Sequence, residues 1–88
     1  MYVIVVYDIK TGPRGPKIMK YLRQRLLWVQ NSVFEGEVTD AGWEEILFTL
    51  KKMINKEKDS IIYYTFESRK YSNRKVLGLE KNSTDSFI

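Results

Sequence analysis

The chain opens with a run of apolar residues that ends at a single carboxylate. Residues 2–9 are rich in Val, Ile and Tyr and contain neither Gly nor Pro, a composition typical of a β-strand. The side chains that would alternate between its two faces are all apolar: Tyr2, Val3, Ile4, Val5, Val6 and Tyr7. A strand that is apolar on both faces is typical of the interior of a sheet with both faces covered.

Two later stretches place apolar residues at helical spacing. The first helix is predicted over residues 17–27, after the loop 11–16 (TGPRGP), whose Pro16 suits a first helical turn. The second is predicted to follow Thr39, a residue type that caps helix N-termini well. The apolar stripes of the two helices are Ile18, Leu22 and Leu26, and Trp43, Ile46, Leu47, Leu50, Met53 and Ile54.

Three further strands are predicted, over residues 28–38, 60–67 and 74–80, with a bulge or bend at Gly36. The resulting order is strand, helix, strand, helix, strand, strand. It fits the ferredoxin-like βαββαβ pattern in either of two ways: residues 28–38 form a hairpin, or the two C-terminal strands supply the third and fourth strands. In both cases the predicted fold class is α+β, an antiparallel sheet with two helices on one face.

The length supports one domain, predicted over residues 1–80, followed by a tail over 81–88. Two helices cover only one face of the sheet, yet the first strand is apolar on both. Each large apolar side chain left in water gives up roughly 1.5–3 kcal/mol of burial free energy. We therefore predict a homodimer packed through the second face, with coverage by the chain's own C-terminal segment as the alternative.

Composition narrows the possible chemistry. The 88 residues contain no Cys and no His, which excludes disulfides, thiolate metal sites and imidazole catalysis. No apolar stretch approaches the ~20 residues of a membrane span, and no signal peptide is recognisable, so a cytoplasmic location is expected. The remaining candidates are carboxylates, hydroxyls, Lys, Arg and a hard, oxygen-seeking metal.

Asp8, at the end of the first strand, is the candidate carboxylate. One interpretation is that it accepts backbone N–H bonds from the loop 11–16, as Asp commonly does in turns. The other is that it binds Mg²⁺, which often takes only one or two carboxylates and keeps several waters. In a two-fold dimer, two copies of Asp8 that approach each other would repel unless a cation lay between them.

The net charge of +4 favours a polyanionic partner only mildly. The basic residues form two groups, one around the first helix and one near the C-terminal strands. Together they are candidates for contacts with nucleic-acid phosphates, which bind the backbone without reading sequence, and the alternative is ordinary solvated surface. The groups are Arg14, Lys17, Lys20 and Arg23, and Arg69, Lys70, Arg74 and Lys75.

Three segments resemble a known family: YDI at 7–9, WVQNSVFEGEV at 28–38 and KVLGLEKN at 75–82. The chain resembles the second CRISPR-associated core protein, the small subunit of the spacer-acquisition machinery. This resemblance implies a ferredoxin-fold homodimer whose sheets pack against each other. It also implies that the C-terminal segment adds a strand to the sheet of the partner subunit.

The resemblance further implies a site at the dimer axis, with Asp8 as the Mg²⁺ ligand (Mn²⁺ being an alternative) and Tyr7 and Phe34 beside it. A basic residue of the family's first-helix region is matched loosely by Arg14, and a second Arg carried by some members is replaced here by Trp28. Members are metal-dependent endonucleases acting on RNA or on duplex DNA. They also bridge two dimers of the CRISPR integrase while holding the DNA to be inserted.

Several functions therefore stay open for this chain. It is expected to be an endonuclease that uses Mg²⁺ at Asp8, or a non-catalytic DNA-binding scaffold for the integrase. An RNA-recognition module on a similar fold is less favoured, because the strands lack the aromatic and glycine signature of base-stacking sheets. A regulatory domain for a small molecule is supported by the fold class alone.

Overall fold

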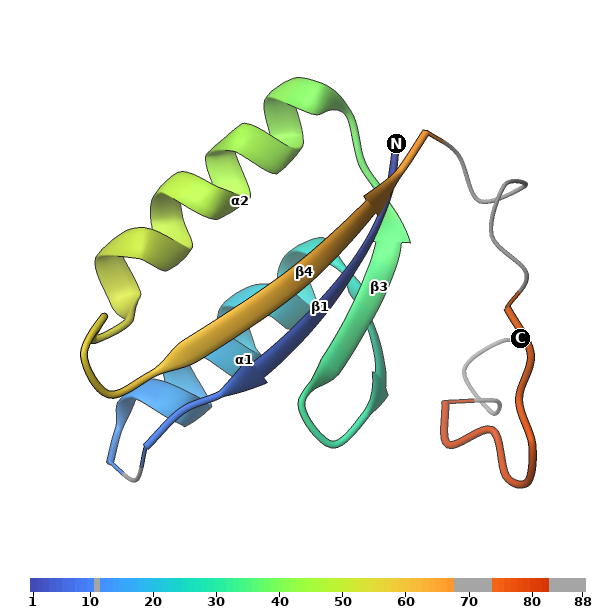
Figure 1. Ribbon diagram of the computed structural model, residues 1–88, viewed down its shortest axis with the longest axis horizontal. Helices are drawn as coiled ribbons and strands as arrows, with labels where there is room; N and C mark the ends of the chain where they lie inside the picture. Colours follow the sequence, from blue (N-terminus) through green and yellow to red (C-terminus); the bar gives the residue numbers. More distant parts are fainter. Residues whose placement is uncertain (11, 68–73, 83–88) are drawn as a thin grey trace.

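The computed structural model describes residues 1–10, 12–67 and 74–82 of the chain, and the elements fall in the order strand, helix, strand, strand, helix, strand. Figure 1 shows them arranged as one sheet with the helices on one side of it. The elements are β1 (Tyr2–Asp8), α1 (Arg14–Arg25), β2 (Leu27–Gln30), β3 (Val33–Glu37), α2 (Asp40–Met53) and β4 (Ser60–Phe66).

The sheet has four antiparallel strands in the order β2-β3-β1-β4. This is the predicted α+β class with the βαββαβ order. Of the two arrangements left open by the sequence, the hairpin is confirmed: the stretch predicted as one strand is β2 and β3, joined by a turn at Asn31 and Ser32. Asn31 has a φ of 41°, a left-handed conformation that Asn adopts more readily than most residues.

The irregularity in this hairpin does not lie at Gly36, so the predicted bulge there is wrong. Gly36 pairs regularly with Val3, and the register shifts instead between Trp28 and Gln30. A Cβ at Gly36 would lie 3.0 Å from Cδ2 of Leu26. The glycine therefore serves the close packing of β3 against the end of α1.

Both helices follow the predicted apolar stripes, with small shifts in their bounds. α1 begins at Arg14, three residues earlier than predicted, and Pro16 lies in its first turn. Thr39 caps α2 as predicted, since its hydroxyl accepts a hydrogen bond from the Gly42 N–H at 3.0 Å. Their buried faces and the sheet enclose one core, made of Val3, Val5, Tyr7, Ile18, Leu22, Leu26, Phe34, Trp43, Ile46 and Leu50.

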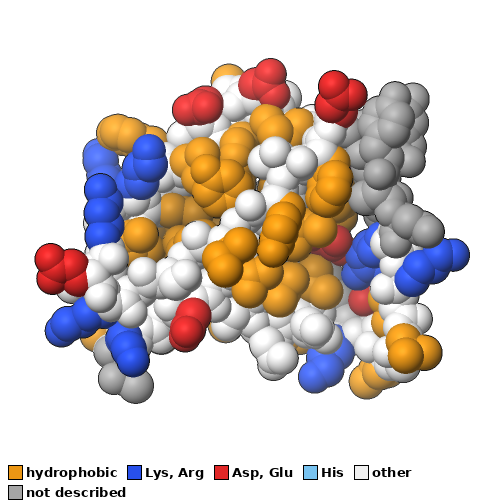
Figure 2. Space-filling model, viewed as in Figure 1, with side chains coloured by type: hydrophobic (Ala, Val, Ile, Leu, Met, Phe, Trp, Pro, Cys, Tyr) orange, Lys and Arg blue, Asp and Glu red, His pale blue; other side chains and the backbone are white. Residues whose placement is uncertain are grey.

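The second face of the sheet stays open in the described part of the chain. The side chains of β1 alternate, so Val3 and Val5 face the helices while Val6 faces the open side together with its β4 neighbour Ile62. Figure 2 shows hydrophobic side chains gathered over the sheet in the middle of this view. The exposed apolar side chains of this open face are Val6, Leu27, Ile62 and Tyr64.

Residues 74–80 do not form the predicted strand. They run beside β2 and β3 without pairing to either, and Arg74 anchors them through ion pairs to Glu35 on β3 (2.7 Å) and to Glu80 (3.0 Å). Leu77 and Leu79 are exposed, at 104% and 77%. The apolar residues that suggested a strand do not pair with any strand in the described part of the chain.

The tail over 81–88 lies largely outside the described residues, and its predicted exchange with a partner stays a prediction. None of the helices in the described ranges is long and apolar enough to cross a bilayer.

Candidate functional site

Asp8 is the last residue of β1 and lies opposite Ser60, the first residue of β4. Its side chain is exposed and shares the open face of the sheet with Val6. Within the described residues, no hydrogen bond or ion pair engages the Asp8 carboxylate. A carboxylate in that state has all of its oxygen lone pairs available for a ligand.

The loop after β1 is held by a different carboxylate, that of Asp59. Asp59 Oδ1 accepts the Lys10 N–H at 3.0 Å, and Asp59 Oδ2 accepts the Asn55 N–H at 2.8 Å. The Arg14 guanidinium binds both oxygens, with Nε at 2.7 Å from Oδ2 and Nη2 at 3.1 Å from Oδ1. Asp59, and not Asp8, is therefore the carboxylate that accepts hydrogen bonds on both sides of the loop 11–16 among the described residues, from the Lys10 N–H and the Arg14 side chain.

These contacts make Asp59 a strongly stabilised anion. Its side chain has no exposed surface, while that of Arg14 is 29% exposed. The hydrogen bond from Arg14 holds the pKa of the Asp59 carboxyl well below its usual range, and the backbone N–H groups of Asn55 and Lys10 add to this effect against the cost of burial. Asp59 is consequently ionised throughout the physiological range.

Arg14 was predicted both as a site residue and as a phosphate contact. The structure places its guanidinium on Asp59, so its fork is occupied by a carboxylate in the chain itself. A bidentate pair of this kind is among the stronger hydrogen-bonded contacts in proteins.

Tyr7 and Phe34 lie beneath the site. Their rings stack with centroids 6.2 Å apart and an interplanar angle of 22°. Phe34 is fully buried and Tyr7 is 7% exposed, so both belong to the core that supports the end of β1. Burial raises the pKa of the Tyr7 hydroxyl, against the opposing effects of a hydrogen bond with Ser32 and the charge of Arg23. Tyr7 therefore stays protonated at neutral pH.

A shallow hollow of about 350 Å³ lies beside Asp8, between the end of β1, the first turns of α1 and the β2–β3 turn. It lies between the Asp8 carboxylate and the start of α1. Its lining residues are Tyr7, Asp8, Ile9, Gly15, Pro16, Met19 and Ser32.

The predicted basic groups are only partly available for phosphates. Lys17, Lys20 and Arg23 are exposed on α1, and the Arg23 guanidinium lies 5.9 Å from the centre of the Trp28 ring. In the second group Lys75 is exposed, whereas Arg74 is paired with Glu35 and Glu80. Arg69 and Lys70 lie outside the described residues.

A divalent cation would meet few ligands on one copy of the chain. Among residues 1–10, 12–67 and 74–82, no three His, Cys, Asp or Glu side chains lie close enough to hold a metal together. Asp8 alone fits a Mg²⁺ ion that keeps most of its waters.

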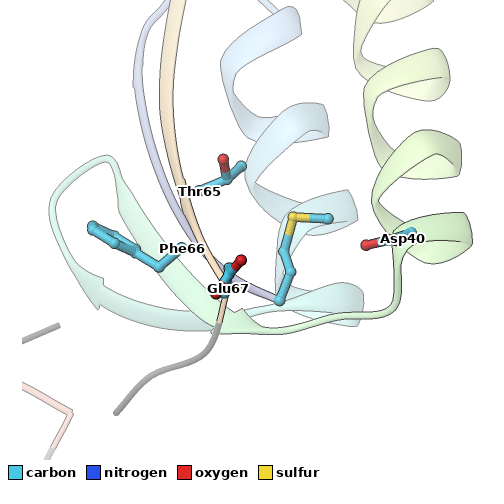
Figure 3. Close-up of a pocket in the computed structure, with 5 residues that line it drawn as sticks. Asp40, Thr65, Phe66 and Glu67 are labelled. Carbon is cyan, nitrogen blue, oxygen red and sulfur yellow. The ribbon is translucent and has the colours of Figure 1, made fainter. Parts of the chain in front are cut away.

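Another hollow, of about 370 Å³, lies at the opposite end of the sheet (Figure 3). It is bounded by Met1, by Asp40 at the start of α2, and by Thr65, Phe66 and Glu67 at the end of β4. Two of these five residues are acidic, which disfavours a phosphate.

Asp59 is the residue that sequence reasoning missed. It stands in the turn NKEKDS (residues 55–60), where acidic and basic residues alternate as they do on many solvated surfaces. The available signal was its position directly before an apolar strand. That position places it beside the end of any antiparallel neighbour, and here the neighbour is β1.

Comparison with known proteins identifies the family. The sequence profile described as CRISPR associated protein Cas2 matches residues 1–74. A Pyrococcus furiosus protein named CRISPR-associated endoribonuclease Cas2 is 49% identical over 88 residues, covering 100% of both chains. A protein of the same name from Methanothermobacter thermautotrophicus is 47% identical and is covered over 96% of its length, with 100% of this chain.

Solved structures agree with the sequence relatives. A crystal structure described as cas2 superposes with a TM-score of 0.80 at 41% identity, over 92% of this chain and 90% of the other. Streptococcus pyogenes Cas2, crystallised at pH 6.5, gives a TM-score of 0.70 at 34% identity, over 89% and 100% of the two chains. This chain therefore belongs to the Cas2 family of CRISPR-associated proteins.

Proposed function

We propose that this chain is a metal-dependent endonuclease that cleaves single-stranded RNA, with Asp8 as its metal ligand. The observation that carries the proposal is the state of Asp8: exposed at the end of a buried central strand, with no partner in the described chain. The relatives described above are named endoribonucleases, which supports the reaction class.

Different side chains of this chain would bind the metal, support the strand and bind the substrate. The Asp8 carboxylate would hold Mg²⁺ or Mn²⁺, and Tyr7 and Phe34 fix the end of the strand from below. When bound, the ion supplies Lewis acidity and lowers the pKa of a coordinated water. Lys17 and Lys20, which are exposed on α1, would bind phosphates of the substrate backbone.

The site is proposed to be complete only in a homodimer. Asp8 shares the open face with Val6 and Ile62, whose exposed fractions are 36% and 53%. Packing two such faces about a two-fold axis would bury these side chains, and an axis that passes near the end of β1 would bring the two copies of Asp8 together. Two carboxylates near each other repel unless a cation lies between them, so a pair of Asp8 side chains would favour a bound metal ion.

The test is cleavage of a labelled single-stranded RNA by purified protein with Mg²⁺, Mn²⁺ or a chelator. We expect cleavage that needs the metal and is lost in Asp8→Asn, which keeps the size of the side chain but removes its charge. Glu57→Gln, an exposed acid in the α2–β4 turn, is the matched control and should cleave normally. Equal cleavage by wild type and Asp8→Asn would contradict the proposal.

A second candidate is a non-catalytic scaffold that holds duplex DNA for the CRISPR integrase. It is favoured by the exposed cations on α1, which need no catalytic carboxylate. Both functions predict nucleic-acid binding that weakens steeply with salt. They differ in the effect of Asp8→Asn: in a reconstituted integration reaction the scaffold would still support spacer insertion, whereas RNA cleavage would be lost.

A further inference from the structure

We infer that Asp59 is a positioning residue for Asp8, and that Arg14 serves the site through Asp59 instead of through the substrate. The inference rests on the proposed function at Asp8 and deepens it. It assigns a role to a buried acid that the sequence motifs of the site do not contain.

First, the Asp59 carboxylate joins several segments of the chain. Asp59 binds Lys10 in the loop after β1, Arg14 at the start of α1 and Asn55 in the turn after α2. Its own N–H also donates to the Asn55 carbonyl at 2.8 Å. Three separate parts of the chain are therefore tied together at a side chain with no exposed surface.

The second step is the place of this junction relative to Asp8. Asp59 directly precedes Ser60, the residue paired with Asp8 across the sheet. Lys10, whose N–H it accepts, is two residues beyond Asp8. Asp59 thus fixes the backbone of the strand opposite Asp8 and the backbone that follows Asp8. Within the described residues, the Asp8 side chain makes no hydrogen bond or ion pair that would set its direction.

The third step is the role of Arg14. Its guanidinium fork matches the two oxygens of Asp59 and supplies the charge that keeps this buried carboxylate ionised. A lysine would keep the charge but lose the fork. If Arg14 instead bound substrate phosphate, a lysine would retain much of that contact, because phosphate also accepts a point charge.

These alternatives separate in a double-mutant cycle on RNA cleavage, with Arg14→Gln, Asp59→Asn and the double variant. We expect each single variant to lower kcat by about 10- to 100-fold with KM little changed, in the range seen when groups supporting a metal ligand are removed. The double variant should be no slower than the slower single one, because both changes remove one contact. Arg14→Lys should resemble Arg14→Gln.

Lys56→Ala, which removes an exposed cation from the same turn, is the control and should leave kcat and KM unchanged. An increase in KM for Arg14→Gln with normal kcat, full activity of Arg14→Lys, or additive losses in the double variant would overturn the inference. If Asp59→Asn does not fold, the Arg14 variants still decide, since they leave the Asp59 carboxylate in place.

A readout without catalysis separates this inference from the proposed function. Amide hydrogen exchange at Lys10 and Ser60 should be slow in the wild type and at least about tenfold faster in Arg14→Gln, as expected when a local contact opens. Unchanged exchange would overturn the positioning role even if the wild type cleaves RNA. Faster exchange in a protein that cleaves no RNA would instead refute the nuclease while upholding the contact.

Discussion

At the scale of single residues, the end of β1 brings together two aspartates in opposite states. Within the described residues, Asp8 is exposed and makes no hydrogen bond or ion pair, whereas Asp59 is buried and accepts hydrogen bonds from three other residues. The sequence singled out Asp8 because it ends an apolar run. For Asp59 it offered only a position before an apolar strand, because the burial of that side chain depends mainly on Lys10 and Arg14, which are more than forty positions away along the chain.

The lowered pKa of Asp59 predicts a specific acid sensitivity. An unfolded Asp titrates near 3.9, so the unfolded chain binds a proton there while the native carboxylate does not. Stability from this group is therefore complete above about pH 4 and lost as the pH falls further. Urea unfolding measured between pH 6 and pH 2.5 should show this loss.

Arg14→Gln is the comparison for this acid sensitivity. It removes the largest cause of the pKa shift at Asp59, so its stability should fall less between these pH values than that of the wild type. An identical dependence on pH in the two proteins would show that the Arg14 contact does not hold the Asp59 pKa down.

Phe34 allows a second prediction at this scale. Its ring is fully buried and stacks on Tyr7 below the candidate site. Phe34→Ala should lower the free energy of unfolding by about 3–5 kcal/mol, since a large buried ring leaves a cavity. Phe34→Leu should cost clearly less in the same urea titration. A loss below about 1 kcal/mol in the alanine variant would contradict the placement in the core.

At the scale of elements, local pattern predicted the helices and β1 well and the C-terminal segment badly. The stripes of α1 and α2 and the cap at Thr39 follow from spacing and hydrogen-bonding chemistry within a few residues. Residues 74–80 have strand-like composition too, but a strand needs a neighbouring edge, and pattern alone cannot supply one. The hairpin was left open because the periodicity of residues 28–38 did not decide whether a turn interrupts them.

The cap of α2 gives a prediction for an element boundary. Thr39→Ala removes the hydroxyl that accepts the Gly42 N–H and should lower the free energy of unfolding by about 0.5–2 kcal/mol. Thr49→Ala, inside the same helix, is the matched control and should cost less, because Ala favours the helix interior. Chemical denaturation followed by circular dichroism measures both. Equal losses would mean that the cap contributes little.

At the scale of the whole molecule, the open sheet face is the feature that one chain does not explain. It was anticipated because β1 is apolar on both faces, and the structure places Val6, Ile62 and Tyr64 on it with substantial exposure. The contacts that a second copy would make depend on how two surfaces fit together. The residue pattern of one strand does not determine that fit. The predicted dimer therefore needs its own measurement.

We expect the protein to be a dimer by sedimentation equilibrium and Ile62→Glu to be largely monomeric. A two-fold interface would bury the new carboxylate twice, at several kcal/mol each, so Kd should rise by more than about 100-fold. Phe48→Glu, at an equally exposed apolar residue on the outer side of α2, should stay dimeric. A monomeric wild type, or dissociation in the Phe48 variant alone, would contradict the proposed packing.

The central place of β1 also has a consequence for synthesis. The first strand to leave the ribosome pairs on one side with β3 and on the other with β4, whose residues lie more than fifty positions later. In a nascent chain, β1 therefore lacks its neighbour β4 until nearly all of the domain has been translated. Such long-range pairing slows folding, so a ribosome stall shortly before residue 60 should leave a chain that depends on chaperones.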